Sequence, residues 1–357
     1  MVKIIFTFVI SFAITFFVVP LIIRVASKYG ISALSTEHST HKKYVPTLGG
    51  IGIFIGFVVG LFFIKDFFPL VNKNFFNHFL GLVIGSFLIL IEGIYDDIKG
   101  ANYVKKFAFQ ITASLVVIYF GYNITFISNP FGDNLQLGIF SVPVTILWIT
   151  GITNAVNLID GLDGLAAGIG AIVSLIFIVI AYKLGDFTGI LVSSLLLGAT
   201  LAFLRYNFNP AKVFMGDVGS QFIGFILASI SIDSFFSLPS SPAVFIPIIA
   251  LGLPIIDTLL AFFRRIMIGS HPFRGDKKHI HHCLINKDIG YKRTVFYIYG
   301  ANLFLGIAAF LLVILSTNFT MPILILVCLF ILLALFKIGY PGFLFSYKNG
   351  KKEKYPS

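Results

Sequence analysis

The feature that constrains this chain most is a series of apolar segments, each close to the length needed to cross a bilayer. A helix needs about 20 apolar residues to span the hydrocarbon core. Eleven windows approach this length, at 4–23, 48–64, 79–95, 107–122, 141–159, 165–183, 188–205, 220–236, 243–263, 295–315 and 319–337. With 57% hydrophobic and 11% charged residues, the 357-residue chain is not an ordinary soluble domain. We predict an all-α polytopic membrane protein with eleven transmembrane helices.

Two segments invite a different reading. The first window could be a secretion signal, but its apolar run is long, Arg24 follows it, and no small-residue cleavage site is present. We therefore interpret it as the first span. The segment 123–140 contains Asn-Pro at 129–130 and Gly-Asp at 132–133, which favour turns. We predict a turn or a short hairpin there, outside the bilayer.

The lysines and arginines separate onto the two faces of this predicted bundle. Alternating loops assign 22 of the 26 to one face and 4 to the other. Because positive charge accumulates on the cytoplasmic side, we predict the N-terminus outside and the C-terminus in the cytoplasm. The net charge of +11 follows from this topology, so no nucleic-acid partner is expected. One transmembrane domain (1–338) and a short basic tail (339–357) account for the chain.

The polar, motif-rich stretches all fall on the predicted cytoplasmic face. They lie at 46–50, 96–97, 103–110, 153–168, 209–220 and 279–282. The even-numbered helices begin on this face, and helix amino ends attract phosphate through free N–H groups and partial positive charge. Several converging amino ends, with a divalent cation among aspartates, could hold a pyrophosphate.

The stretch 153–168 carries the densest chemistry. Asp160 and Asp163 each precede a glycine and lie between two apolar windows. Carboxylates at a membrane helix end are costly without a compensating cation, and the glycines let a ligand approach closely. Asn154 and Asn157 lie six and three residues before Asp160, on roughly one helical face. The pattern indicates a metal-phosphate or nucleotide site.

Two further acidic groups and a histidine cluster complete the polar set. Asp96 and Asp97 repel each other unless a cation relieves them, although a solvated helix end is an alternative. Asp217 is either a helix N-cap or a ligand of Mg²⁺, which binds through one or two carboxylates plus substrate phosphates.

The histidines of 279–282 could suggest zinc, but no cysteine joins them and the loop is rich in Lys and Arg, which favours anion binding. Asp257 needs a partner, and Arg264 and Arg265 lie two turns later.

Together these motifs resemble the polyprenyl-phosphate N-acetylhexosamine-1-phosphate transferases over nearly the whole chain. The residues that carry the resemblance are Pro46-Thr-Leu-Gly-Gly50, Asp96-Asp97, Lys106 with Gln110, Asn154-x-x-Asn157-x-x-Asp160-Gly-x-Asp163, Gly216-Asp217, Arg264-Arg265 and His279-x-His281-His282. The His-x-His-His form is similar to the branch that uses UDP-N-acetylglucosamine, the WecA and TagO type.

The resemblance implies transfer of a sugar 1-phosphate from a UDP-sugar donor to a polyprenyl phosphate in the plasma membrane, with a cytoplasmic active-site cleft and a homodimer. It implies catalytic roles for Asp96, Asp97, Asp160, Asp163 and His282. It implies substrate binding by Lys106, Asn157, Arg265, His279, His281, Thr47 and Gly49. The implied cofactor is Mg²⁺, with Mn²⁺ as an alternative, held by Asp217 and Asp97.

Several alternatives stay open at this point. The donor could carry phospho-N-acetylmuramoyl-pentapeptide or another N-acetylhexosamine, and the product could initiate lipopolysaccharide or teichoic acid. The lipid phosphate could attack directly, or an aspartate could first form a phosphoryl-enzyme. A transporter that uses the aspartates as an ion relay is the rival from another class, although relay acids belong near the bilayer midplane.

Overall fold

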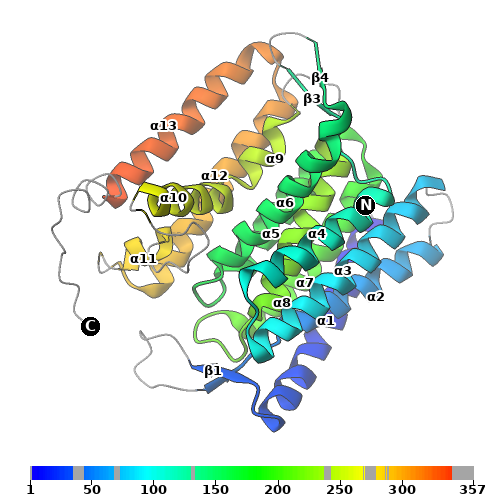
Figure 1. Ribbon diagram of the computed structural model, residues 1–357, viewed down its shortest axis with the longest axis vertical. Helices are drawn as coiled ribbons and strands as arrows, with labels where there is room; N and C mark the ends of the chain where they lie inside the picture. Colours follow the sequence, from blue (N-terminus) through cyan, green and yellow to red (C-terminus); the bar gives the residue numbers. More distant parts are fainter. Residues whose placement is uncertain are drawn as a thin grey trace.

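The computed structural model describes residues 2–34, 44–67, 73–129, 133–236, 243–267, 269, 279–285, 287 and 289–339. Most of this part of the chain is helical, and the long helices lie side by side in a bundle (Figure 1). The helices are α1 (Val2–Lys28), α2 (Gly50–Phe67), α3 (Lys73–Lys99), α4 (Tyr103–Tyr119), α5 (Ser141–Ile159), α6 (Leu165–Leu184), α7 (Phe187–Asn207), α8 (Gly216–Ser231), α9 (Phe245–Ala250), α10 (Gly252–Met267), α11 (Ile280–Ile285), α12 (Tyr291–Ile314) and α13 (Thr320–Ile338).

The chain is an all-α polytopic membrane protein. Eight helical segments of the described chain are long and apolar enough to cross a bilayer. These are Val2–Lys28, Phe76–Lys99, Gly138–Ile159, Leu165–Leu184, Phe187–Asn207, Gly216–Phe236, Tyr291–Ile314 and Thr317–Ile338. The windows predicted at 48–64 and 107–122 form the shorter helices α2 and α4.

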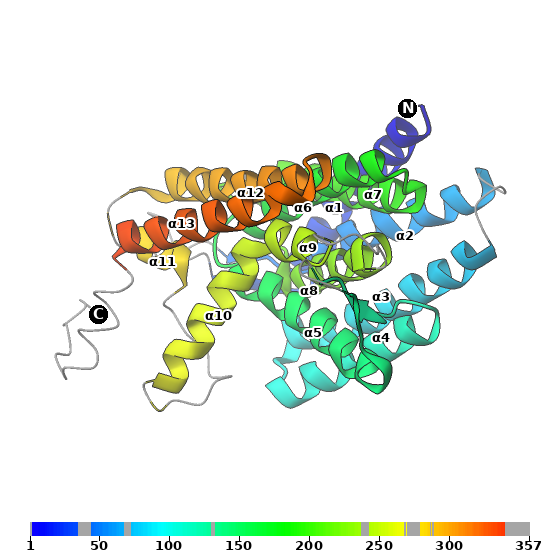
Figure 2. The ribbon, with the colours of Figure 1, turned by 90° about the horizontal axis from the view of Figure 1, so that it is seen from above.

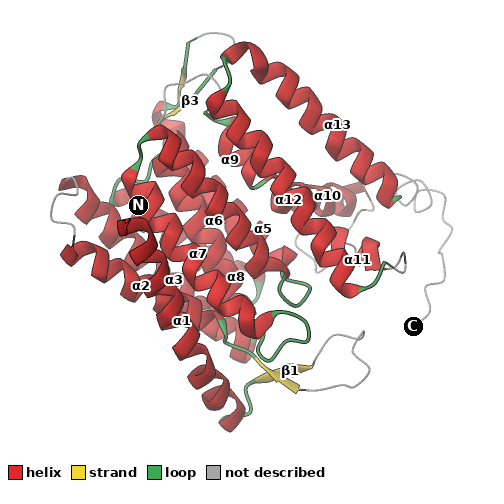
Figure 3. Cartoon of the chain, turned by 180° about the vertical axis from the view of Figure 1, so that it is seen from behind, coloured by secondary structure: helices red, strands yellow, loops and turns green. Residues whose placement is uncertain are grey.

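Helix α8, continued by a π-helical turn (Ile232–Phe236), forms the centre of the bundle. It contacts α2, α3, α5, α6 and α7, and 94% of its most apolar window is buried. The corresponding window of α13 is only 17% buried, so α13 lies at the periphery (Figure 3). Residues at the start of α8 are therefore surrounded by the ends of several other helices.

The predicted window 243–263 is not a single helix, which corrects the sequence interpretation. Helix α9 ends at Ala250, and α10 begins at Gly252 after one turn residue, Leu251. Pro254 lies in the first turn of α10, where its missing N–H is tolerated, whereas a continuous helix would place it in the interior. Figure 2 shows α10 leading away from the main bundle.

Two short antiparallel hairpins lie between the helices. Strand β3 (Phe126–Ile127) pairs with β4 (Leu135–Gln136), which confirms the hairpin predicted within 123–140. Strand β1 (Ser32–Leu34) pairs with β2 (Tyr44–Pro46), with Ser32 opposite Pro46. The second hairpin was not predicted, and it places the segment after Pro46 beside the start of α2.

Candidate active site

The segment before α2 is joined to the segment before α8 by backbone hydrogen bonds. Phe214 N–H donates to Pro46 O (2.8 Å), and Gly49 N–H donates to Phe214 O (3.0 Å). Gly50 N–H donates to Met215 O (2.9 Å), which fixes the two helix starts against each other. The Gly49 amide is thus engaged within the protein, and the predicted role of Gly49 in substrate binding stays a prediction. Gly49 permits close packing instead, since a Cβ there would meet Phe214 O at 2.7 Å.

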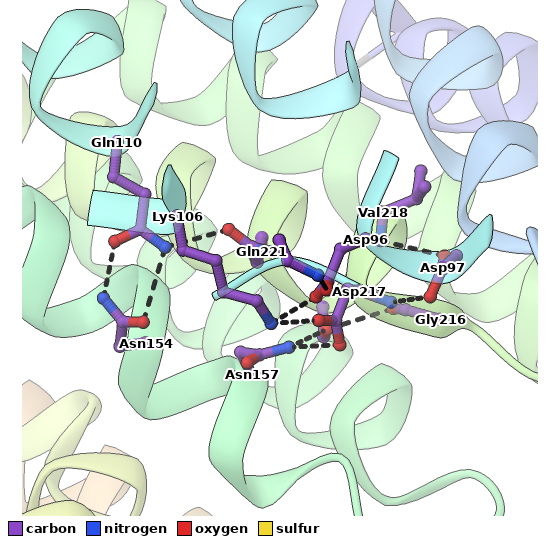
Figure 4. Close-up of polar contacts among 12 residues, drawn as sticks. Asp96, Asp97, Lys106, Gln110, Asn154, Asn157, Gly216, Asp217, Val218 and Gln221 are labelled. Atoms are coloured by element: carbon purple, nitrogen blue, oxygen red, sulfur yellow. Dashed lines mark hydrogen bonds and ion pairs between the residues drawn. The ribbon is translucent and has the colours of Figure 1, made fainter. Parts of the chain in front are cut away.

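The carboxylate of Asp97, at the end of α3, caps the amino end of α8 (Figure 4). Asp97 Oδ1 accepts from Asp217 N–H (2.9 Å), and Oδ2 lies 3.4 Å from Val218 N. Gly216 adopts φ +73°, and a Cβ there would overlap the Asp97 carboxylate. Glycine is required at this position for both reasons. An acid at a helix amino end also gains from the partial positive charge of that end.

A lysine from α4 links the acids of α3 and α8. Lys106 Nζ forms ion pairs with Asp96 Oδ2 and with Asp217 Oδ2. Asn157 Nδ2, from α5, donates to the other oxygen of Asp217 (2.9 Å) and to Ser220 Oγ (2.9 Å). Four helices therefore contribute to one polar cluster, as the sequence predicted for these residues (Figure 4).

A buried amide network lies next to this cluster. Gln110 Nε2 donates to Gln221 Oε1 (2.9 Å), and Asn154 Nδ2 donates to Gln110 Oε1 (2.6 Å). Gln221 was missed by sequence reasoning, although it lies one helical turn after Asp217 and on the same face. Its signal was a polar amide in an otherwise apolar window.

The acidic loop between α5 and α6 is held from two sides. Asp163 Oδ2 accepts from Asn209 Nδ2 (3.1 Å) and Ala211 N–H (3.2 Å). The Asp163 N–H contacts the hydroxyl of Tyr291, at the start of α12. These contacts position the loop, so the structure gives Asp163 a demonstrated structural task beside its predicted catalytic one.

A cavity of about 270 Å³ lies at the junction of these elements. The carboxylates that line it come from Asp97, Asp160, Asp163 and Asp217. Thr47 also lines it, and its hydroxyl is buried without a hydrogen-bond partner in the described chain. Burial, followed by the charges of the neighbouring aspartates, raises the pKa of Asp160 to about 8. The aspartates repel one another as they ionise, and a bound cation would relieve this repulsion.

The histidine segment covers the acidic loop. Asp257, on α10, accepts from Ile280 N–H (2.8 Å), and its other oxygen lies 2.9 Å from His279 Nδ1. The rings of His279 and His281 are parallel, with centroids 5.8 Å apart. The imidazole of His281 lies against Gly161, where a Cβ would overlap it. The sequence suggested an arginine partner for Asp257, and the structure shows His279 as a partner.

The electrostatic state of His281 differs from the expectation of a cationic anion-binding loop. Burial, and then the neighbouring charge of His282, lowers the pKa of His281 to about 3. The ring is therefore neutral at physiological pH, and neither nitrogen has a hydrogen-bond partner within the described residues. It can interact with a ligand through hydrogen bonds rather than through charge. Arg265, in the last turn of α10, is buried and does not line the cavity.

Comparison with known proteins identifies the family of this chain. A model of glycosyl transferase family 4 matches residues 79–235. The chain is 34% identical over 313 residues to the probable undecaprenyl-phosphate N-acetylglucosaminyl 1-phosphate transferase of Bacillus subtilis, covering 87% of this chain and 86% of that protein. The chain belongs to the polyprenyl-phosphate N-acetylhexosamine-1-phosphate transferase family.

Two other relatives of this transferase extend the comparison. The decaprenyl-phosphate N-acetylglucosaminephosphotransferase of Mycobacterium tuberculosis is 32% identical over 321 residues, which cover 83% of this chain and 78% of that protein. The phospho-N-acetylmuramoyl-pentapeptide-transferase of Streptococcus equi is 35% identical over 247 residues, covering 62% and 70%. The region matched by the family model contains the four cavity carboxylates and ends before the histidine segment.

Proposed function

We propose that this transferase moves N-acetylglucosamine 1-phosphate from UDP-N-acetylglucosamine to a polyprenyl phosphate. An oxygen of the lipid phosphate forms the new pyrophosphate bond, the bond to UMP breaks, and polyprenyl-pyrophosphoryl-N-acetylglucosamine results. The observation that carries the proposal is the set of four carboxylates around one cavity beside Lys106. Phosphoryl transfer depends mainly on positioning and charge neutralisation, which such a cluster supplies. The names of the Bacillus and Mycobacterium relatives support the choice of sugar.

The proposed membrane placement has eleven crossings, with α9 and α10 together forming the ninth. The N-terminus lies outside, the C-terminal tail lies in the cytoplasm, and the acidic cavity opens at the cytoplasmic face of the plasma membrane. The distribution of 22 basic residues on one face and 4 on the other supports this orientation. Accordingly, the acids lie at helix ends, which favours a transferase over an ion relay at the midplane.

The cavity fits Mg²⁺, or Mn²⁺ as an alternative. Its charged lining is entirely carboxylate, and oxygen is the ligand type that these hard ions prefer. Within the described residues no three His, Cys, Asp or Glu side chains form a protein-only metal cage, so phosphate and water oxygens would complete the shell. Asp217 and Asp97 are the proposed ligands. When bound, the ion would neutralise the donor pyrophosphate.

The side chains around the cavity have separate proposed tasks. Asp96 orients or deprotonates the lipid phosphate, and Lys106, which already bridges two carboxylates, neutralises a phosphate oxygen. Asn157 holds Asp217 in position through its amide. His281, neutral and without a hydrogen-bond partner in the described part of the chain, hydrogen-bonds the donor above the acidic loop. Asp257 positions His279 and the first turn of α11.

The test is a donor screen on purified protein in lipid nanodiscs. UMP release is measured with UDP-N-acetylglucosamine, UDP-N-acetylgalactosamine and UDP-N-acetylmuramoyl-pentapeptide, with and without polyprenyl phosphate and Mg²⁺. We expect release only when the first donor, the lipid phosphate and the ion are all present. Faster UMP release from the pentapeptide donor would assign the protein to the phospho-N-acetylmuramoyl-pentapeptide branch of the family. No UMP release from any donor would reject the proposal.

A further inference from the structure

A second, larger cavity lies between α10, α11, α12 and α13. Its volume is about 630 Å³, within the range of roughly 300–1,000 Å³ that is usual for ligand pockets. Its walls are aliphatic and aromatic, with Leu253 from α10, Leu284 from α11, Phe304 from α12 and Phe330 from α13. The four helices are grouped on one side of the molecule (Figures 1 and 2). The reaction proposed above makes no use of this space.

The cavity is amphipathic along its length. Its charged lining residues are Lys287 and Lys337, and Lys287 Nζ donates to Lys337 O (2.8 Å), so both lie at one end. This end is on the same face of the bundle as the acidic site, because Tyr291, at the nearby start of α12, contacts Asp163.

The length of the cavity matches one leaflet of a bilayer. Along α12 its walls extend from Phe296 to Leu305, which is about 14 Å at the rise of an α-helix. Half of a hydrocarbon core is about 15 Å thick. In the proposed membrane placement, the cavity therefore has a cationic end at the membrane surface and an apolar body that reaches toward the midplane.

We propose that this cavity binds one anionic phospholipid, with an acyl chain between α12 and α13 and the phosphate at Lys287 and Lys337. Lysines at the bilayer surface attract anionic headgroups, and an apolar body next to lipid is most favourably filled by a chain. The inner leaflet as the source of this lipid rests on the proposed topology, whereas the binding does not.

The bound lipid is distinct from the lipid substrate. The two cavities share no lining residue, and neither Lys106 nor any of the four carboxylates lines the larger one. A phosphate at Lys287 is thus held apart from the reacting groups. Helix α11 nevertheless contributes to both regions, because Ile280 and Leu284 line the lipid cavity while His281 lies against Gly161. The phospholipid supports the helix that carries the histidines.

A steric variant tests whether the lipid occupies the cavity. A Cβ on Gly300 would meet no atom within 4 Å, and Gly300 lines the cavity, so Gly300→Phe is expected to place its ring in the cavity. Gly151→Phe on α5 is the matched control, since Gly151 is also exposed and equally open. Native mass spectrometry of delipidated protein titrated with phosphatidylglycerol measures binding. We expect affinity at least about tenfold lower for Gly300→Phe and unchanged for Gly151→Phe.

A charge variant tests the headgroup site. Lys287→Gln with Lys337→Gln should remove the preference for phosphatidylglycerol over phosphatidylcholine, whereas Lys212→Gln with Lys292→Gln, two exposed lysines outside the cavity, should retain it. Equal binding of the two phospholipids by the wild type, or wild-type binding by Gly300→Phe, would overturn the proposal. So would stronger competition by a polyprenyl monophosphate, which would assign the cavity to the substrate. UMP release, measured separately, tests the proposed reaction independently of these outcomes.

Discussion

The acidic side chains at the two ends of the central helix α8 have different surroundings. At one end of the segment Gly216–Phe236, Asp217 shares Lys106 with Asp96 and lines a cavity with three other aspartates. At the other end, Asp233 Oδ1 lies 3.0 Å from His78 Nδ1, so one acid meets one base. The first end has a surplus of acidic groups beside a cavity, and the second has a matched pair.

This difference shows that an acid in a membrane helix is not by itself evidence of function. The ring of His78 also packs on Tyr122, with centroids 4.7 Å apart, so the pair joins α3, α8 and the segment after α4. Such a pair offsets the free-energy cost of an acid within the membrane and holds the helices against each other. Surplus acids are costly unless a ligand is bound, and this cost is the physical sign of a site.

The largest expected effect is a loss of turnover when the acid at the cavity end of α8 is changed. Asp217→Asn removes the charge that faces Lys106 and the proposed ion, so we expect kcat/KM to fall about 10³-fold. The measurement is UMP release by purified protein. Asp233→Asn is the matched control, because it makes the same change at the other end of the same helix. A loss of less than tenfold for Asp217→Asn would remove the distinction between the two ends.

The next effect concerns Asp257, which acts on the site through His279. Asp257→Asn keeps an acceptor for Ile280 N–H but disturbs the contact with His279, so the histidine segment loses its fixed orientation. Loss of such an orienting partner costs about 10–100-fold in analogous sites. We expect the change mainly in KM for the UDP-sugar. A fall in kcat alone, with KM unchanged, would contradict the positioning role.

The apolar windows predicted most of the helices of the bundle because length and hydrophobicity decide which segments enter a bilayer, whereas the orientation drawn from the charge distribution stays a prediction. They did not predict the break at Leu251, because Pro254 at the fourth turn of an apolar run is equally compatible with a kinked helix. The Asn-Pro and Gly-Asp pairs in 123–140 predicted the hairpin through local turn chemistry, which needs no tertiary information.

Residue types predicted the acidic cavity, but individual partners depended on tertiary packing. Asp97 and Asp217 are 120 residues apart, so no local pattern shows that Asp97 accepts from the amino end of α8. The same limit applies to Asp257 and His279, which are 22 residues apart and lie in different elements. The protonation state of His281 could not be predicted from the sequence either, because its lowered pKa arises from burial that only the folded chain creates.

A smaller effect is expected when Asp233, the acid paired with His78 at the other end of the central helix, is changed. Asp233→Asn weakens the contact with His78 without touching the cavity, so turnover should stay within about threefold of wild type. Loss of a hydrogen bond to a charged group costs about 1–3 kcal/mol, which lowers the thermal unfolding midpoint by about 5 °C. Unfolding is followed by the fluorescence of Trp148. A large loss of turnover with unchanged stability would show that this end is also functional.

The smallest effect is a pH dependence that comes from the burial of Asp160 beside the other aspartates. Asp160 has a pKa of about 8 in the folded, ion-free protein and about 3.9 in the unfolded chain, so the folded state holds the proton over this interval. Stability is therefore highest near or below pH 4 for this group and falls as the pH rises toward 8. Between pH 6 and 7.5 we expect the unfolding midpoint of ion-free wild type to fall on the order of 3 °C more than that of Asp160→Asn. Identical slopes for the two proteins would mean that Asp160 is ionised and already compensated, and the contrast between the ends of α8 would then rest on Asp217 alone.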